Sequence, residues 1–208
     1  WDIFSTEPGK MDWSGYDPVV EAAAAQGVKL MLSVVGAPAW SRTYVDANPE
    51  AAPPDDLTLF AQFLGELVDR YPGKIHAIEV WNEQNLDREW DTAEGVNALR
   101  YVEMLRLAYQ TIKARDPNIV VISGALSPTG ANFTDSNNPN RVTVVDDFAY
   151  FQQMIDAGSP VSDAASANGH LDFWVDGVEI GPWTDLWWRT VPTLKVNFLW
   201  LFLYHHDA

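Results

Sequence analysis

Three apolar, strand-like segments recur along the N-terminal part of the chain, and helical periodicity precedes each of them. The strand-like runs begin at residues 28, 75 and 119, so they repeat every 44 to 47 residues. This spacing suits one strand and one helix with generous loops, and continuous apolar runs are typical of parallel strands covered on both faces. The repeat therefore predicts an α/β fold with a parallel sheet.

The predicted helices have recognisable ends. The first is expected to begin at Asp17-Pro18 and to run to Gln26, with Gly27 as its C-terminal cap, and Asp55 or Asp56 can cap the second. Asp91, with Glu94 three residues later, resembles a capping box for a long third helix. These end signals agree with the strand spacing and support three successive helix–strand units.

Long loops follow the three predicted strands, at residues 36–54, 82–91 and 125–143. Polar and aromatic residues collect in these loops, as they do on the working face of a (β/α)8 barrel. No Gly-x-Gly-x-x-Gly follows any strand, so a nucleotide-binding sheet lacks its main signal. The loops thus mark one edge of the sheet as the candidate functional face.

The segment Trp81-Asn82-Glu83-Gln84-Asn85 stands where the second apolar run opens into its loop. A glycosidic oxygen leaves poorly unless it is protonated, so its cleavage needs a carboxyl group that gives and later takes a proton. Glu83 is placed for that role, while the amides of Asn82, Gln84 and Asn85 could bond sugar hydroxyls. The ring of Trp81 could offer a flat apolar surface to a sugar.

Several neighbours admit two interpretations. Trp40 and Trp90 could add aromatic surfaces to a sugar site, but packing is the more ordinary role for both. Glu79 lies four residues before Glu83, on the same side of the predicted strand but deeper along it. A buried structural carboxylate is therefore expected there. His170 could lie near a strand end, where a sugar-binding histidine would be reasonable.

A series of motifs runs in order along residues 1–85. They are Trp1-Asp2-Ile3-Phe4, Glu7-Pro8-Gly9-Lys10-Met11-Asp12-Trp13, Tyr16-Asp17, Gly27-Val28-Lys29-Leu30, Ala37-Pro38-Ala39-Trp40 and Trp81-Asn82-Glu83-Gln84-Asn85. In this order they resemble landmarks of clan-A retaining glycoside hydrolases, especially bacterial proteins around family 39 and the cellulase-like family 5. The resemblance runs to about residue 158. It implies a TIM-type (β/α)8 barrel with Glu83 as general acid/base and Asn82 bonded to the sugar 2-hydroxyl.

The same resemblance implies a second carboxylate, because a retaining glycosidase needs a nucleophile about 5 to 5.5 Å from its acid. The candidate is Glu179, in a Val178–Trp183 segment that is similar to the clan's Glu-x-Gly-x-Trp pattern. It follows Glu83 by 96 residues, which is short for this clan. The segment also aligns with a sixth-strand region that carries no catalytic residue, and Glu179 would then be an ordinary loop glutamate.

The resemblance does not cover a complete barrel. Trp1 stands at the family's second strand, and the likeness frays from about Ser159. Half of the ten tryptophans fall in the last 35 residues, which suggests a rebuilt hydrophobic edge or a segment of different origin. We expect residues 1–208 to form a single glycosidase-like barrel domain, incomplete or truncated, whose Trp-rich C-terminal segment favours self-association.

Charge narrows the choice of partners. The formal net charge of −16 would repel nucleic acid and anionic membranes, whereas a neutral carbohydrate meets no such barrier. The apolar stretch of residues 196–204 is too short to span a bilayer.

With no cysteine and no metal-binding spacing among the four histidines, neither a cofactor nor a metal is expected. We expect a secreted or extracytoplasmic protein, although the N-terminal residues do not resemble a signal peptide.

Two functions remain open from sequence. One is a retaining hydrolase of β-linked oligo- or polysaccharides, with Glu83 as acid/base and Glu179, or a residue outside this chain, as nucleophile. The other is a non-catalytic carbohydrate-binding protein or an inactive remnant of such an enzyme. The presence of a second carboxylate near Glu83 distinguishes them.

Overall fold

A computed structural model describes residues 1–44, 52–158, 169–175 and 178–186, with side chains described up to residue 158. No helix within these ranges has the length and apolar character needed to cross a bilayer. The elements, in chain order, are η1 (Asp2–Phe4), α1 (Asp17–Ala25), β1 (Leu30–Val34), η2 (Ala39–Ser41), α2 (Leu57–Arg70), β2 (Ile75–Val80), α3 (Ala98–Arg115), β3 (Val120–Ser123), β4 (Phe133–Thr134), β5 (Val142–Val144), α4 (Asp147–Gly158), β6 (Gly169–Val175) and β7 (Val178–Leu186).

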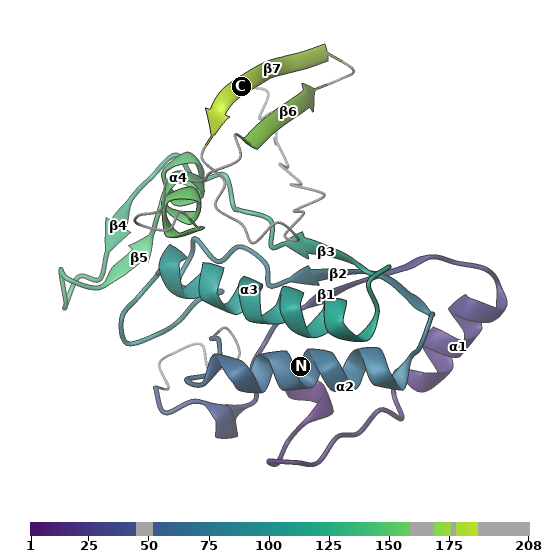
Figure 1. Cartoon of the computed structure of the whole chain (residues 1–208). Helices are drawn as coiled ribbons and strands as arrows, with labels where there is room; N and C mark the ends of the chain where they lie inside the picture. Colours follow the sequence, from purple (N-terminus) through teal and green to yellow (C-terminus); the bar gives the residue numbers. More distant parts are fainter. Residues whose placement is uncertain (45–51, 159–168, 176–177, 187–208) are drawn as a thin grey trace, which may run out of the picture.

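The centre of the fold is a parallel sheet of three strands in the order β1-β2-β3. Leu32 pairs with Ile78, and Ile78 pairs in turn with Val121. Helices α2 and α3 pack against each other and run beside the sheet (Figure 1). The predicted α/β fold and its three strands are confirmed, whereas closure into a (β/α)8 barrel stays a prediction.

The two faces of the sheet differ in exposure. Val34 and Ile78 belong to the hydrophobic core, on the side of the helices. Side chains alternate along a strand, so Met31 and Ser33 point to the other face, where Met31 is 54% exposed. Glu79 pairs with Ser33 on this open face and is half-buried rather than buried. One face of the sheet is therefore packed, and the other is exposed at β1 but buried at Ile122 of β3, the partner of Glu79.

A continuous chain of aromatic rings runs through the packed side. Each ring centroid lies 5.6 to 5.9 Å from the next. This row of ring contacts connects the N-terminal segment to α2, to the end of β2 and then to α3. Its members in order are Trp1, Phe60, Trp81, Trp90 and Tyr101. Because large rings bury much apolar surface, this chain fixes the end of β2 relative to both helices.

The helix caps confirm one expectation and correct another. The Asp56 side chain accepts a hydrogen bond from the Thr58 N–H at 2.9 Å and caps α2, as one of the two predicted alternatives. The capping box expected at Asp91 is wrong, because α3 begins at Ala98 and its cap is Asn97. Asp91 is instead buried in an ion pair with Arg141.

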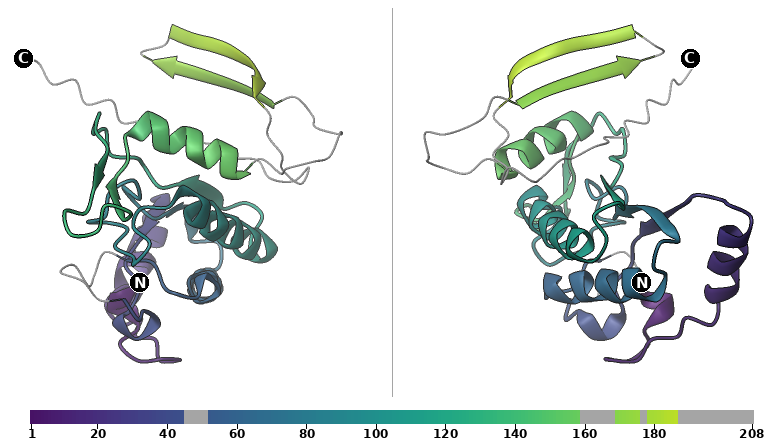
Figure 2. Two further views of the ribbon diagram at one scale, coloured as in Figure 1. Left: turned by 90° about the vertical axis from the view of Figure 1, so that its left-hand side faces the viewer. Right: turned by 45° about the vertical axis from the view of Figure 1, so that its right-hand side comes forward.

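Beyond the sheet, the chain forms smaller units. β4 and β5 form an antiparallel pair, and α4 packs beside α3 (Figure 2). β6 and β7 form a second antiparallel pair, in which Trp174 lies opposite Glu179. The predicted self-association of the Trp-rich segment concerns side chains outside the described residues and stays a prediction.

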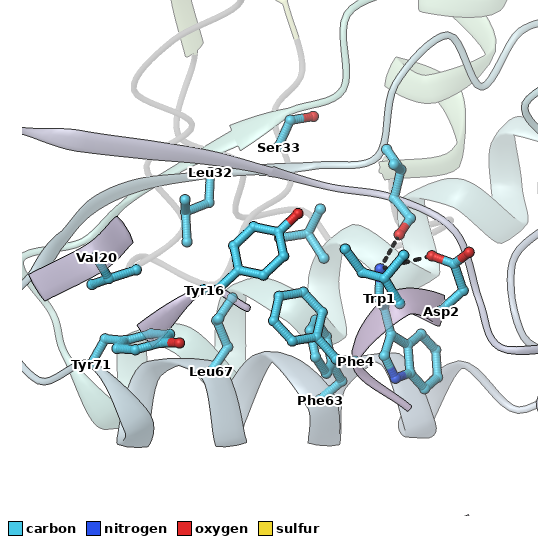
Figure 3. Close-up of a pocket in the computed structure, with 13 residues that line it drawn as sticks. Trp1, Asp2, Phe4, Tyr16, Val20, Leu32, Ser33, Phe63, Leu67 and Tyr71 are labelled. Atoms are coloured by element: carbon cyan, nitrogen blue, oxygen red, sulfur yellow. Dashed lines mark hydrogen bonds and ion pairs between the residues drawn. The ribbon is translucent and has the colours of Figure 1, made fainter. Parts of the chain in front are cut away.

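A mainly apolar cavity of about 190 Å³ lies between the N-terminal segment, β1 and α2. The rings of Phe4, Tyr16 and Phe63 line it (Figure 3). Arg70 and Tyr71, at the end of α2, bind Asp17 at the start of α1. No residue of the loop after β2 is among the lining residues, so the cavity is separate from the predicted site.

Removal of the α2 cap should destabilise the protein. Asp56→Ala should lower the free energy of unfolding by about 1 kcal/mol, because the Thr58 N–H loses its acceptor. Urea denaturation followed by circular dichroism measures the change. Glu66→Ala, at an exposed position of the same helix, should change it by no more than about 0.5 kcal/mol. Equal losses in the two variants would contradict the capping role.

Candidate active site

The site is built on an unusual turn at the C-terminal end of β2. Trp81 and Glu83 both have left-handed backbone conformations, with φ angles of 71° and 46°. A positive φ is uncommon for residues other than glycine, and it is particularly unfavourable for a bulky side chain. The Trp81 N–H still donates to the Val34 carbonyl at 3.0 Å, so the chain leaves the parallel ladder only after Trp81.

The Trp81 side chain turns inward and anchors this turn. It is 1% exposed and packs between the rings of Phe60 and Trp90. Its Nε1–H donates to the Glu89 carbonyl at 2.7 Å. The predicted sugar-stacking surface is therefore not presented by Trp81, because the left-handed turn directs its ring into the core. Trp90 is also fully buried, in agreement with a packing role.

The first residues after β3 pack closely against the turn at the end of β2. A Cβ atom on Gly124 would lie 2.7 Å from the Trp81 carbonyl oxygen and 2.5 Å from Gln84 Oε1, so only glycine leaves room here. The Glu83 N–H donates to the Ala125 carbonyl at 2.8 Å. The position of Glu83 thus depends on contact between the ends of two adjacent parallel strands.

The Glu83 carboxyl group faces outward from the turn. Its side chain is 27% exposed, and Oε2 accepts a hydrogen bond from the guanidinium of Arg88, which is 59% exposed. Asn82 is half-buried, and its side-chain amide makes no hydrogen bond to any described residue. The structure therefore leaves both the predicted acid/base and the predicted hydroxyl-binding amide accessible from solvent.

Glu89 adds a second carboxyl group that the sequence reasoning missed. Burial raises the pKa of Glu89, the nearby charge of Glu83 raises it further, and Arg88 opposes both effects. The available signal was the charged run Asp87-Arg88-Glu89, which follows Glu83 within the same loop. A carboxyl group with a raised pKa beside a second carboxyl group is a feature of acid–base sites and also of ion-pair networks.

Asn85 has a structural position rather than the expected sugar-binding one. Its Nδ2 donates to the carbonyls of Ser127 and Val145 at 2.8 and 2.9 Å. Its Oδ1 accepts from the Ser127 N–H at 2.8 Å. The side chain is buried with its hydrogen-bonding groups occupied, so it joins the loops after β2 and β3.

The other predicted site residues lie on different elements. Trp40 belongs to η2, after β1, where it is half-buried and donates to the Ser5 carbonyl at 3.1 Å. His170 lies on β6 and Glu179 on β7, and their side chains fall outside the described residues. The nucleophilic role of Glu179 and the sugar-binding role of His170 therefore stay predictions.

The described part of the site can exchange protons and bond hydroxyl groups. It brings together the carboxyl groups of Glu83 and Glu89, the Arg88 guanidinium and the Asn82 amide. Among the side chains up to residue 158 that the structure describes, no group of three His, Cys, Asp or Glu could hold a metal ion.

Comparisons with known proteins give partial structural likenesses. No family model and no curated protein matches the sequence. A GH39 β-xylosidase from Caulobacter crescentus is 26% identical with a TM-score of 0.46, over 60% of this chain and 31% of that one. The GH39 enzyme from Xanthomonas axonopodis pv. citri is 18% identical with a TM-score of 0.48, over 76% and 40%. A psychrophilic glycoside hydrolase family 10 endo-β-1,4-xylanase is 13% identical with a TM-score of 0.46, over 74% and 46%.

The chain thus spans less than half the length of these solved structures. By their names, two of them are GH39 enzymes and the third is a glycoside hydrolase of family 10.

Glu89 should make stability depend on pH in a defined direction. Because its pKa is raised on folding, the folded protein binds this proton more tightly than the unfolded chain does. Ionised Glu89 therefore destabilises the folded state, and the lost stability returns as the pH falls through the raised pKa. Glu89→Gln should raise the free energy of unfolding at about pH 7 and have little effect below about pH 4, near the ordinary pKa of Glu.

Urea denaturation at the two pH values measures this effect. Glu66→Gln, at an exposed position on α2, serves as the control and should show no such difference. A loss of stability in Glu89→Gln at neutral pH would contradict the assigned direction.

Gly124→Ala should damage the turn selectively. The added methyl group would meet the Trp81 carbonyl, and forcing it in should cost about 1–3 kcal/mol of unfolding free energy. Gly15→Ala is the matched control, because a Cβ there meets nothing within 4 Å. Thermal unfolding of both variants measures the difference, and equal midpoints would show that the turn tolerates a side chain.

Proposed function

We propose that this chain belongs to a glycoside hydrolase that cleaves β-linked oligo- or polysaccharides by a retaining mechanism with two carboxyl groups. One observation carries the proposal: Glu83 lies at the C-terminal end of a parallel strand, on a left-handed turn that leaves its carboxyl group accessible. Active sites of barrel enzymes are built at this end of their strands. The proposed substrate is a neutral carbohydrate, which the acidic surface would not repel.

In this proposal Glu83 acts first as an acid and then as a base. Its proton passes to the glycosidic oxygen as the C–O bond breaks, while a second carboxylate attacks the anomeric carbon and forms a glycosyl-enzyme. Glu83, now ionised, takes a proton from the water that releases the sugar. Asn82, whose amide has no hydrogen-bond partner among the described residues, would bond the sugar 2-hydroxyl.

Glu179 is the proposed nucleophile of this chain. The support comes from its sequence context, since Glu179-Ile180-Gly181-Pro182-Trp183 is similar to the clan's nucleophile motif. Its backbone lies on β7, a strand antiparallel to β6. Glu179→Gln should abolish turnover if this assignment is correct, and it should leave turnover unchanged if Glu179 is an ordinary loop residue.

A non-catalytic carbohydrate-binding protein, or an inactive remnant of a hydrolase, is the second candidate. The observation that favours it is the Arg88 guanidinium, which donates to Glu83 Oε2, the oxygen that could otherwise carry the catalytic proton. A ligand could then be held by hydrogen bonds to Asn82 and Arg88 without any bond being cleaved.

Glu83→Gln tests the acid role. Hydrolysis of substrates with poor leaving groups, such as soluble β-glucan, mannan and xylan, should fall by about 10²- to 10⁴-fold, because no proton reaches the departing oxygen. Activated aryl β-glycosides should lose less, because their leaving groups need little help. Initial rates on both substrate classes give the comparison.

Glu103→Gln, at an exposed position of α3, is the control and should keep the rates of the unchanged protein. Equal losses on both substrate classes in Glu83→Gln would argue against an acid role. Saturable sugar binding without hydrolysis by the unchanged protein would select the second candidate.

A further inference from the structure

The loop that carries Glu83 is fastened along its length to the neighbouring part of the chain. We call residues 82–97 the Glu83 loop. Backbone hydrogen bonds connect this loop to β5 and the residue after it at three points. These are Asp87 N–H to Thr143 O at 2.8 Å, Val96 N–H to Val142 O at 2.8 Å, and Val145 N–H to Asn85 O at 2.9 Å. The loop is therefore placed by residues about 50 positions further along the sequence.

Arg141, the residue before β5, lies at the centre of this contact. Its side chain is only 6% exposed. The guanidinium binds Asp91 directly and lies 3.6 Å from Asp87 and 3.4 Å from Asp135. Its Nε–H donates to the Thr92 carbonyl at 3.0 Å. Removing one partner of a buried ion pair is strongly destabilising, because the other charge is left unpaired. Arg141 and Asp91 therefore fix each other's positions.

The same guanidinium contacts the loops after all three parallel strands. Its central carbon lies 5.8 Å from the ring centroid of Tyr44, in the loop after β1. Asp87 and Asp91 lie in the loop after β2, and Asp135 follows β4, in the longer connection that leads from β3 to β5. A planar, five-donor group can bridge partners in several directions, which a lysine ammonium does less well.

The positions of its two partners in the Glu83 loop explain what this contact does to the site. Asp87 and Asp91 lie on either side of Arg88 and Glu89. Arg88 is the residue that binds the Glu83 carboxylate, and the Glu89 carbonyl accepts from the buried Trp81 ring. Fixing both flanks therefore fixes the segment that surrounds the Glu83 side chain.

We propose that Arg141 is a positioning residue for Glu83: by binding Asp87 and Asp91, it holds the Glu83 loop against β5 with Arg88 facing the Glu83 carboxylate. Its catalytic consequence rests on the proposed function, whereas the positioning itself is a property of the folded chain. Arg141 acts through these partners and touches no reacting group.

Hydrogen exchange of individual amides in the full chain tests the positioning. The reporters are the N–H groups of Glu83, Asp87 and Val96, and the reference is the Trp81 N–H, which bonds to Val34 in the sheet. Arg141→Met combined with Asp91→Leu removes the two most buried charges of the cluster together, and the carboxylates that remain, Asp87 and Asp135, are partly exposed. In this variant the reporters should exchange roughly tenfold to a hundredfold faster, because charge-assisted hydrogen bonds are lost, while the reference changes much less.

Further variants separate positioning from general destabilisation. Arg141→Lys keeps the charge but loses the planar fork, so its reporters should exchange at intermediate rates. Asp87→Asn weakens only the more exposed contact of Arg141 with the Glu83 loop, so the reporters should again exchange faster than the reference, but by a smaller factor. This variant keeps the test available if the double variant does not fold. Arg70→Met, which breaks an exposed ion pair between α2 and α1, should leave the reporters unchanged. Reporters that speed up no more than the reference in both Arg141 variants and in Asp87→Asn would overturn the proposal.

Activity distinguishes failure of this proposal from failure of the proposed function. If the unchanged protein hydrolyses a β-glycoside, Arg141→Lys should lower kcat while KM stays nearly constant, because a misplaced acid affects the transition state more than substrate binding. A fall in kcat without selective exchange would overturn the positioning role. Selective exchange in a protein that hydrolyses nothing would leave Arg141 as the residue that places the loop and would reject the hydrolase function.

Discussion

The burial of the Trp81 ring is the interaction on which the candidate site depends. Trp81 occupies the last position of the parallel ladder, and its indole ring lies in the middle of the aromatic chain that connects the N-terminal segment with α2 and α3. A left-handed backbone at a tryptophan is unfavourable and persists only where surrounding contacts over-determine it. Here the packing of a large ring and its hydrogen bond to the Glu89 carbonyl supply that compensation. The turn thus buries Trp81 and leaves the side chain of Glu83, two residues later, 27% exposed.

The compensation comes from several elements rather than from the turn itself. Tyr101 of α3 is fully buried, donates to the Val80 carbonyl at 2.9 Å and accepts from the Gly124 N–H at 2.7 Å. It thereby bridges the ends of β2 and β3, and burial of this phenol raises its pKa so that it stays a donor. Gly124 lets β3 end close behind Trp81. An accessible carboxyl group at a strand end thus requires a buried frame that includes both neighbouring strands and a helix.

The sequence predicted the parts of this structure that depend on local patterns. The three strands follow from apolar runs, and Asp56 was one of two recognised cap candidates for α2. Expectations failed where a residue's partner is distant. Asp91 looked like a helix cap, but Arg141, fifty residues away, recruits it into a buried ion pair. The direction of the Trp81 ring could not be read from alternation, because a left-handed residue breaks the period of two on which that reasoning depends. The ordered motifs that resemble families 39 and 5 predicted residues 81–85 as the candidate site, but they could not distinguish Asn82, which stays accessible, from Asn85, which is buried.

Two arginines at this site, Arg141 and Arg88, have opposite surroundings and different roles. Arg141 is buried among several fixed acceptors, so moving it would leave charges unpaired inside the protein. Arg88 is exposed, and exposed ion pairs contribute at most about 1 kcal/mol, so under the proposed function a sugar hydroxyl would displace its guanidinium from Glu83 at little cost. If Asp87 and Asp91 stay bound to Arg141 while the contact between Arg88 and Glu83 exchanges, the loop keeps Glu83 at a constant position. The Glu83 carboxyl group can then leave Arg88 when a ligand binds. Within Asp87–Asp91 the two ends bind Arg141 and Trp90 is buried, whereas Arg88 is exposed, so the same short segment combines fixed placement with one exchangeable contact.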